Sequence, residues 1–231
     1  MSKTETQTRT SAKKFNVVKL VQLSILVAVE MLLFFTPLGY IPLGFMRATT
    51  MHIPVILAAI AFGPAEGAFM GFVFGLTSFL KNTLEPTITS FVFTPFYSFS
   101  ADYKGNFWSI FICFAPRILI GVVAACVYRA LVPGPAEKPR KLSMTRSSVA
   151  LVLAGVAGSL TNTVLVMSGI CVFFGKQYAS ATGRNFTQLL SYVVTSVVGV
   201  NGVIEAISAG IIILIVGRAI LAFLDRRQKA E

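Results

Sequence analysis

The chain alternates long apolar stretches with short polar joints, and this pattern predicts its elements. Apolar segments cover residues of about 17–36, 50–63, 66–82, 107–131, 147–175 and 189–223. A run of about 18 apolar residues is long enough to cross a bilayer as a helix, and these runs lack the two-residue alternation of strands. Backbone groups in lipid are satisfied only in helices or closed barrels, so we predict six membrane helices.

Two parts of the chain depart from this simple pattern. Residues 83–106 are too polar for a span and contain Pro86 and Pro95, which predicts a long structured loop. Segment 50–63 is short for a full span and segment 189–223 is long, so we expect tilt or a break in them.

The predicted fold is an all-α integral membrane protein, a bundle of six transmembrane helices. Residues 1–16 would form an N-terminal tail, 17–224 the membrane domain with the external loop 83–106, and 225–231 a C-terminal tail. The N-terminal apolar run has no convincing cleavage site after it, so we expect a retained helix and not a signal peptide.

Lys and Arg residues give the orientation. Fourteen of them fall on the side of the two termini and five on the opposite side, with Arg117 left inside a helix. Because cytoplasmic loops carry the excess of Lys and Arg, we expect both termini to be cytoplasmic.

Composition supports a membrane protein and weakens other classes. The chain is 55% hydrophobic and only 13% charged, a balance that soluble domains rarely reach. Its net charge of +11 would suggest nucleic-acid binding in a soluble protein, but here the basic residues gather at helix ends. Cys113, Cys126 and Cys171 lie inside apolar runs without CxxC spacing, which favours packing over disulfides or metal.

A few polar side chains lie within the apolar segments and need a reason to be there, because ionisable groups at membrane depth are costly. These are Glu30, His52, Arg117, Asn162, Asn201 and Glu205. Most fall between the midplane and the outer surface, which predicts a small polar cavity open to the outside. For the glutamates we favour pairing with Arg117. For Arg117, Asn162 and Asn201 we favour ligand contact, whereas a lone histidine such as His52 is more often a capping residue.

Small residues mark possible helix contacts. Ser24 and Ala28 form a small-xxx-small pair in the first helix, and Gly67, Gly71 and Gly75 recur every four residues in the third. Such stripes let another helix approach closely. Their spacing does not tell an internal neighbour from a partner subunit, although internal packing is the more frequent case.

Motifs for energy supply and catalysis are missing from the sequence. It contains no GxxxxGK[ST] loop for ATP, no HExxH, no GxSxG and no second histidine. We therefore expect no enzyme, no catalytic or metal-binding residues and no cofactor. A solitary carrier and an intramembrane enzyme stay open as alternatives, although no internal repeat of the kind found in secondary transporters is evident.

The sequence resembles a known family, the substrate-binding S components of energy-coupling factor (ECF) vitamin transporters. The resemblance is carried by ATTMHIPVILAAIAFGPAEGAFMGFVFGLTSFLKNT (48–83), by TSFVFTPF (89–96) and by Pro116 with Arg117. Within the family the chain is most similar to the pantothenate-specific members, although riboflavin and folate members share the scaffold.

The resemblance implies a protein of the bacterial cell membrane that captures a vitamin outside with high affinity. It would deliver the vitamin when docked on a transmembrane T component, which two cytoplasmic ATPases drive. The family docks through an alanine-xxx-alanine motif in its first helix, where this chain has Ser24 and Ala28. Loop residues 36–50 and the loop 83–106 would act as gates over the pocket.

The expected substrate site follows from pantothenate, which carries a carboxylate, an amide and two hydroxyl groups. A guanidinium from Arg117 or Arg47 would take the carboxylate, and side-chain amides would take the remaining groups. The candidate substrate-binding residues are Arg47, Thr49, His52, Asn82, Arg117, Asn162 and Asn201. A riboflavin-specific member would instead need stacking aromatic residues, for which Phe91, Phe93, Phe96 and Tyr97 are candidates.

Overall fold

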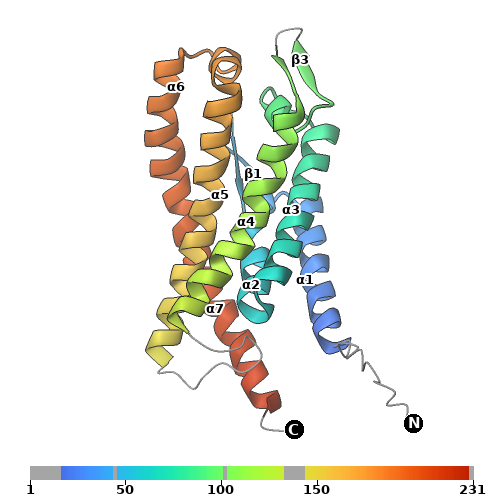
Figure 1. Ribbon diagram of the computed structural model, residues 1–231, viewed down its shortest axis with the longest axis vertical. Helices are drawn as coiled ribbons and strands as arrows, with labels where there is room; N and C mark the ends of the chain where they lie inside the picture. The colour runs from blue at the N-terminus through green and yellow to red at the C-terminus, as the bar shows by residue number, and fades with distance from the viewer. Residues whose placement is uncertain (1–16, 44–45, 101–102, 133–143, 229–231) are drawn as a thin grey trace, which may run out of the picture.

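The computed structural model describes residues 17–43, 46–100, 103–132 and 144–228, and these form a helical bundle with two short hairpins (Figure 1). The helices are α1 (Val17–Phe35), α2 (His52–Phe62), α3 (Pro64–Leu84), α4 (Phe107–Leu131), α5 (Met144–Ala181), α6 (Phe186–Tyr192) and α7 (Val203–Gln228). A 3-10 turn, η1 (Ser90–Val92), and a π-helical segment, η2 (Val193–Gly202), complete them.

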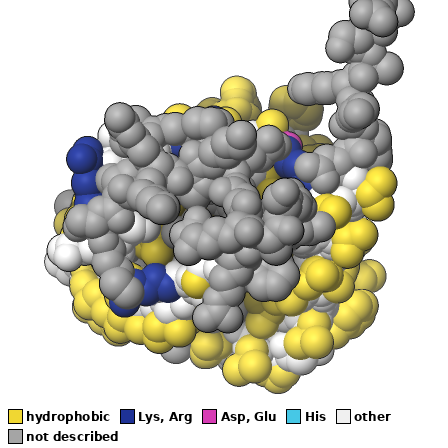
Figure 2. Space-filling view, turned by 90° about the horizontal axis from the view of Figure 1, so that it is seen from below, with side chains coloured by type: hydrophobic (Ala, Val, Ile, Leu, Met, Phe, Trp, Pro, Cys, Tyr) yellow, Lys and Arg dark blue, Asp and Glu magenta, His cyan; other side chains and the backbone are white. Residues whose placement is uncertain are grey.

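The strands form two antiparallel hairpins. β1 (Tyr40–Leu43) pairs with β2 (Met46–Thr49), and β3 (Ser98–Ser100) pairs with β4 (Tyr103–Lys104). We call the end of the bundle that carries β3 and β4 the loop end and the opposite end, where α1 begins and α7 ends, the terminal end (Figure 1). Seen from the terminal end, Figure 2 shows Lys and Arg side chains on this face and hydrophobic side chains around its rim.

Among the described residues, four helical stretches are long and apolar enough to cross a membrane. They are Val17–Phe35, Phe107–Leu131, Thr145–Ala181 and Phe186–Ile220. The last of these is α6, η2 and α7 in succession, so the irregularity expected in segment 189–223 is a π-helical segment. Helix α2 has only 11 residues, too few for a full span.

Helix α2 forms the centre of the bundle, and nearly all of its side chains are buried. It contacts α3, α4, α5 and α7. Gly63 ends α2 with a φ of 118°, a backbone conformation that suits glycine. Pro64 begins α3 at the first helical position, where the N–H that proline lacks would have no helical partner. These two residues therefore fix a sharp joint between α2 and α3.

Helices α3 and α4 approach each other through the glycine stripe of α3. A Cβ on Gly121 of α4 would lie only 2.1 Å from the Gly67 carbonyl carbon, and one on Gly71 would meet the backbone of Arg117. Gly75 faces the ring of Phe114. The stripe thus serves an internal contact between α3 and α4.

Side-chain hydrogen bonds order the loop that follows α3. Thr83 of α3 donates to Thr94 at 2.9 Å, and Ser109 of α4 donates to the Phe91 carbonyl at 2.8 Å. Asn106 caps α4 in a reciprocal capping box with Ser109. The predicted loop 83–106 is therefore attached to both neighbouring helices.

The α3–α4 contact gives a first prediction. Gly121→Ala places a methyl group against the Gly67 backbone, so we expect it to cost about 1–3 kcal/mol, the range for overpacking, and to lower the midpoint of thermal unfolding in detergent. Gly210→Ala in α7 is the matched control, because its Cβ would have no neighbour closer than 3.4 Å, an ordinary contact distance. An unchanged midpoint for Gly121→Ala would contradict the close approach.

Candidate functional site

Arg117 is buried in α4, and Pro116 explains what its side chain binds. A proline has no N–H, so Pro116 leaves the carbonyl of Ile112, four residues earlier, without its helical donor. Arg117 Nη1 donates to this oxygen at 2.8 Å. Pro116 therefore leaves one backbone acceptor without its helical donor, and the side chain of the next residue donates to that acceptor.

The rest of the guanidinium faces aromatic rings. Its central carbon lies 5.6 Å from the ring centre of Phe74 and 5.2 Å from that of Phe93, within the range of cation–π attraction. Nε has no hydrogen-bond partner. Among the described residues no carboxylate lies within ion-pair distance of Arg117, so the expected pairing with a glutamate is wrong.

Glu205 of α7 binds the first hairpin and α5. Its Oε1 accepts from the backbone N–H of Thr49 in β2 at 2.9 Å, and its Oε2 accepts from the Thr163 hydroxyl at 3.2 Å. The carboxylate thereby joins three segments that lie far apart in the sequence.

A second contact holds the other strand of the hairpin. The Tyr40 hydroxyl of β1 shares a hydrogen bond of 3.3 Å with Thr77 of α3, and the Tyr40 ring packs near Phe74. Since Phe74 also contacts Arg117, the hairpin lies beside the aromatic surroundings of the guanidinium.

Several buried polar atoms of α2 and α5 have no partner in the described chain. They are both ring nitrogens of His52, which lies beside the Thr49 backbone, the hydroxyl of Ser159 and the side-chain carbonyl of Asn162. Ile56 of α2 packs on Gly158 of α5. These two helices run in opposite directions (Figure 1), so one turn toward the loop end brings His52 level with Asn162.

The π-helical segment η2 adds Asn201 to this region. Gly202 faces Thr163 of α5, so the turn of η2 that carries Asn201 lies against the turn of α5 that carries Asn162. Asn201 itself is half-buried. Single π-helical turns are frequent at functional sites.

The other polar residues singled out in the sequence lie in different surroundings. Asn82 is buried, donates to the Ser78 carbonyl at 2.8 Å and accepts from the Ser90 hydroxyl at 2.9 Å, so its amide joins α3 to η1. The side chain of Arg47 lies outside the described residues, although its backbone pairs with Pro42. Glu30 is fully buried in α1, with neither carboxyl oxygen hydrogen-bonded.

Ser24 and Ala28, the candidate docking residues, are both exposed on α1. Most of α1 is exposed, and Lys19 joins its terminal end to Glu66 of α3 at 2.6 Å.

Sequence reasoning missed Ser159, Tyr40 and Thr77. A signal for Ser159 was present, because Ser159, Asn162 and Thr163 share one helix face by their spacing of three and four residues. No local signal marks Tyr40 or Thr77, since their contact depends on the hairpin. Within the described residues, no group of three or more His, Cys, Asp or Glu side chains is placed to hold a metal ion.

Comparison with known proteins identifies the family. The sequence profile of the family "ECF transporter, substrate-specific component" matches residues 18–217, most of the chain. The chain belongs to this family. The resemblance inferred from residues 48–83 is therefore confirmed, and the protein is a substrate-binding S component of a membrane transporter.

Two relatives are pantothenate transporters by name. The chain is 35% identical over 167 residues to the pantothenic acid transporter PanT of Lactococcus lactis subsp. cremoris, covering 72% of this chain and 74% of that protein. It is 26% identical over 194 residues to the pantothenate transporter PanT of Leuconostoc mesenteroides subsp. mesenteroides, covering 82% and 84% of the two chains.

The hydrogen bonds of Asn82 give a second prediction. Asn82→Ala removes the link between α3 and η1, which leaves polar groups unpaired at a cost of about 1–3 kcal/mol. We expect faster amide hydrogen exchange in residues 87–94, measured by mass spectrometry. Asn185→Ala in another loop is the control and should leave exchange in 87–94 unchanged. Unchanged exchange in Asn82→Ala together with weaker vitamin binding would assign Asn82 to the ligand instead.

Proposed function

We propose that this S component binds pantothenate and delivers it to an ATP-driven ECF transporter. Both named relatives are pantothenate transporters, and the more similar one is aligned over nearly three quarters of each chain. The observation that carries the proposal is a buried guanidinium that has no carboxylate partner among the described residues.

Arg117 suits the carboxylate of pantothenate. A buried charge is stable only when it is paired, and the described residues place one carbonyl and two aromatic rings against the guanidinium but no carboxylate within ion-pair distance. A bound carboxylate would complete this environment with charge-assisted hydrogen bonds. Glu205 does not compete for Arg117 at close range, because its two oxygens accept from Thr49 and Thr163.

The unpaired groups next to α2 suit the polar remainder of the vitamin. Asn162 offers a carbonyl acceptor, Ser159 a hydroxyl and His52 a donor or acceptor, and all three are buried. Such groups can bind the amide and hydroxyl groups of pantothenate. We assign Asn201 to the edge of the same site, and Thr49 and Arg47 to the hairpin that covers it.

The aromatic residues that a riboflavin site would need have other contacts. The ring of Phe91 is fully buried and packs against Phe174 at 5.9 Å, and Phe96 packs on Phe79 at the same distance. Phe93 lies over Arg117. These contacts favour pantothenate over the riboflavin alternative.

We further propose six membrane segments in a bacterial plasma membrane, with α6, η2 and α7 acting as the sixth and both termini cytoplasmic. The excess of Lys and Arg on the terminal side supports this orientation. The partners would be a T component and two cytoplasmic ATPases. Ser24 and Ala28 would form the docking face, since α1 offers an exposed apolar surface with small residues.

The pantothenate proposal is tested by isothermal titration of the purified protein, stripped of bound ligand, with pantothenate, riboflavin and folate in turn. We expect one-to-one binding of pantothenate alone. Arg117→Ala should weaken it by about 10- to 100-fold, since a hydrogen bond to a charged group contributes about 1.5–3 kcal/mol. Arg117→Lys, which keeps the charge without the fork, should bind at an intermediate level.

Arg129→Ala is the matched control, because Arg129 is an exposed arginine of the same helix toward the terminal end. It should bind pantothenate as the unmodified protein does. Equal affinity in Arg117→Ala would remove Arg117 from the site, and binding of another vitamin would overturn the substrate.

The docking face gives a separate prediction. Ala28→Leu adds volume to the small-residue pair on α1, so it should abolish most pantothenate uptake by cells that express the complete transporter. Binding to the purified protein should stay unchanged, because residue 28 is exposed on the outside of the bundle. Ala130→Leu, at an exposed position of α4, is the control. Full uptake by Ala28→Leu would move the docking face elsewhere.

A further inference from the structure

An apolar groove runs between α4 and α5 on the outside of the bundle, with a volume of about 310 Å³. Its lining combines small residues, among them Ala115, Pro116 and Gly169, with larger apolar side chains such as Leu119 and Leu165. Ser168 is exposed and is the one hydroxyl in the lining. Both helices belong to the stretches able to cross a membrane, so the groove lies at bilayer depth.

Aromatic rings lie at the end of this groove that is nearer the loop end of the bundle. Trp108 stacks on Phe173 with ring centres 4.0 Å apart, and Phe111 packs edge-on against both rings. Trp108, Phe111 and the neighbouring Phe107 are partly or largely exposed. Exposed aromatic residues at the end of a membrane helix are typical of the boundary between hydrocarbon and headgroups.

Lys176 lies just beyond this boundary. Leu165, Gly169, Val172 and Lys176 follow one another at spacings of four, three and four residues, which places them on one stripe of α5. The lysine is exposed. The stripe therefore leads from an apolar groove, past aromatic rings, to a cation.

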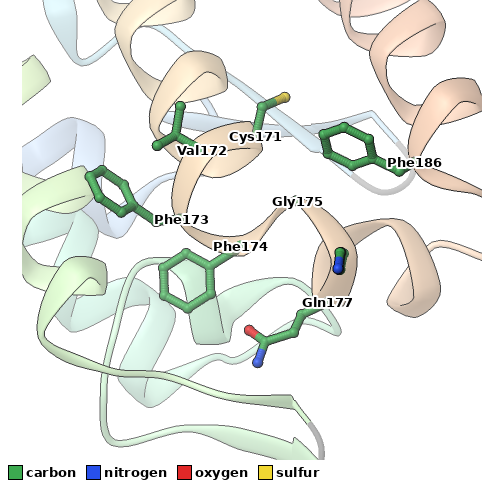
Figure 3. A pocket seen from close by; sticks show the side chains of 8 residues that line it. Cys171, Val172, Phe173, Phe174, Gly175, Gln177 and Phe186 are labelled. Carbon is green, nitrogen blue, oxygen red and sulfur yellow. The ribbon is translucent and has the colours of Figure 1, made fainter.

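A second cavity, which Lys176 helps to line, continues the groove. Its volume is about 460 Å³, and it shares Val172 and Phe173 with the groove. Its lining adds Lys176 and Gln177, two hydrogen-bond donors. Figure 3 shows three of the lining side chains, with Phe173 on one side of α5, Phe186 of α6 on the other and Gln177 below Gly175.

We propose that the groove binds one acyl chain of an anionic phospholipid, whose phosphate pairs with Lys176. The order of apolar, aromatic and cationic groups along α5 matches the order of chain, interface and headgroup in a lipid. An ammonium group at the membrane boundary can pair with a phosphate through charge-assisted hydrogen bonds. The phosphate of a zwitterionic lipid such as phosphatidylcholine is offset by the cation of its own headgroup, so the site should prefer a headgroup with net negative charge.

The single tryptophan of the chain makes this preference measurable, because Trp108 stacks on a residue that lines both cavities. The full chain is placed in phosphatidylcholine vesicles that contain a small, fixed fraction of phosphatidylglycerol or phosphatidylcholine with brominated acyl chains. Bromine quenches tryptophan fluorescence on contact. We expect stronger quenching by brominated phosphatidylglycerol than by brominated phosphatidylcholine.

Lys176→Gln should remove the difference between the two lipids while general quenching remains. Lys104→Gln is the matched control, since Lys104 is another exposed lysine of the loop end, and it should keep the difference. Ser168→Phe fills the groove and should reduce quenching by both lipids. The thermal midpoint of each variant is measured alongside to show that it folds.

Three outcomes would overturn the proposal. Equal quenching by the two lipids in the unmodified protein would exclude a preference for anionic headgroups. A difference that persists in Lys176→Gln would assign the preference to another residue. In the third outcome, inorganic phosphate abolishes the difference in quenching between the two lipids, and Ser168→Phe leaves the quenching unchanged. Lys176 would then bind a simple anion, and the groove would hold no acyl chain.

Discussion

The structure depends on one constraint, which is that backbone polar groups at membrane depth must find partners inside the protein. Pro116 violates the helical pattern by leaving the Ile112 carbonyl open, and the adjacent Arg117 satisfies it. This bond holds the guanidinium near Phe74 and Phe93. The proline in α4 thus both positions the buried guanidinium of Arg117 and provides one acceptor for it.

The same constraint explains how distant segments build the site. Glu205 would be costly alone, and it is stabilised by the Thr49 backbone and the Thr163 hydroxyl. Its partners come from β2 and α5, so the acid joins the hairpin to the bundle. The buried helix α2 contacts both α5 and α7 and contributes His52, while α5 contributes Ser159 and Asn162. The unpaired groups of His52, Ser159 and Asn162 thus come from two helices that contact each other.

Sequence patterns predicted the long helices well, because apolar length is a strong local signal. The ranges 17–36 and 107–131 lie within a residue of α1 and α4. The first hairpin was not predicted, since four-residue strands carry little signal and their order depends on contacts such as that of Tyr40 with Thr77. Arg117 was recognised as a buried cation, but its expected glutamate partner was wrong, because a backbone acceptor four residues from Pro116 took that place. The partner of Glu205, a backbone N–H 156 positions away, has no sequence signature at all.

The glycine contact between α3 and α4 has a mechanical consequence. At Gly67 and Gly121 the two backbones touch, and the neighbouring turns place side chains on both sides of that point. If one helix slid along the other by a turn, a side chain would have to enter the glycine contact, where the backbones leave no room for it. The two helices therefore behave as a rigid rod, and any rearrangement of the bundle has to hinge at its loosely packed elements, of which the exposed α1 is the clearest.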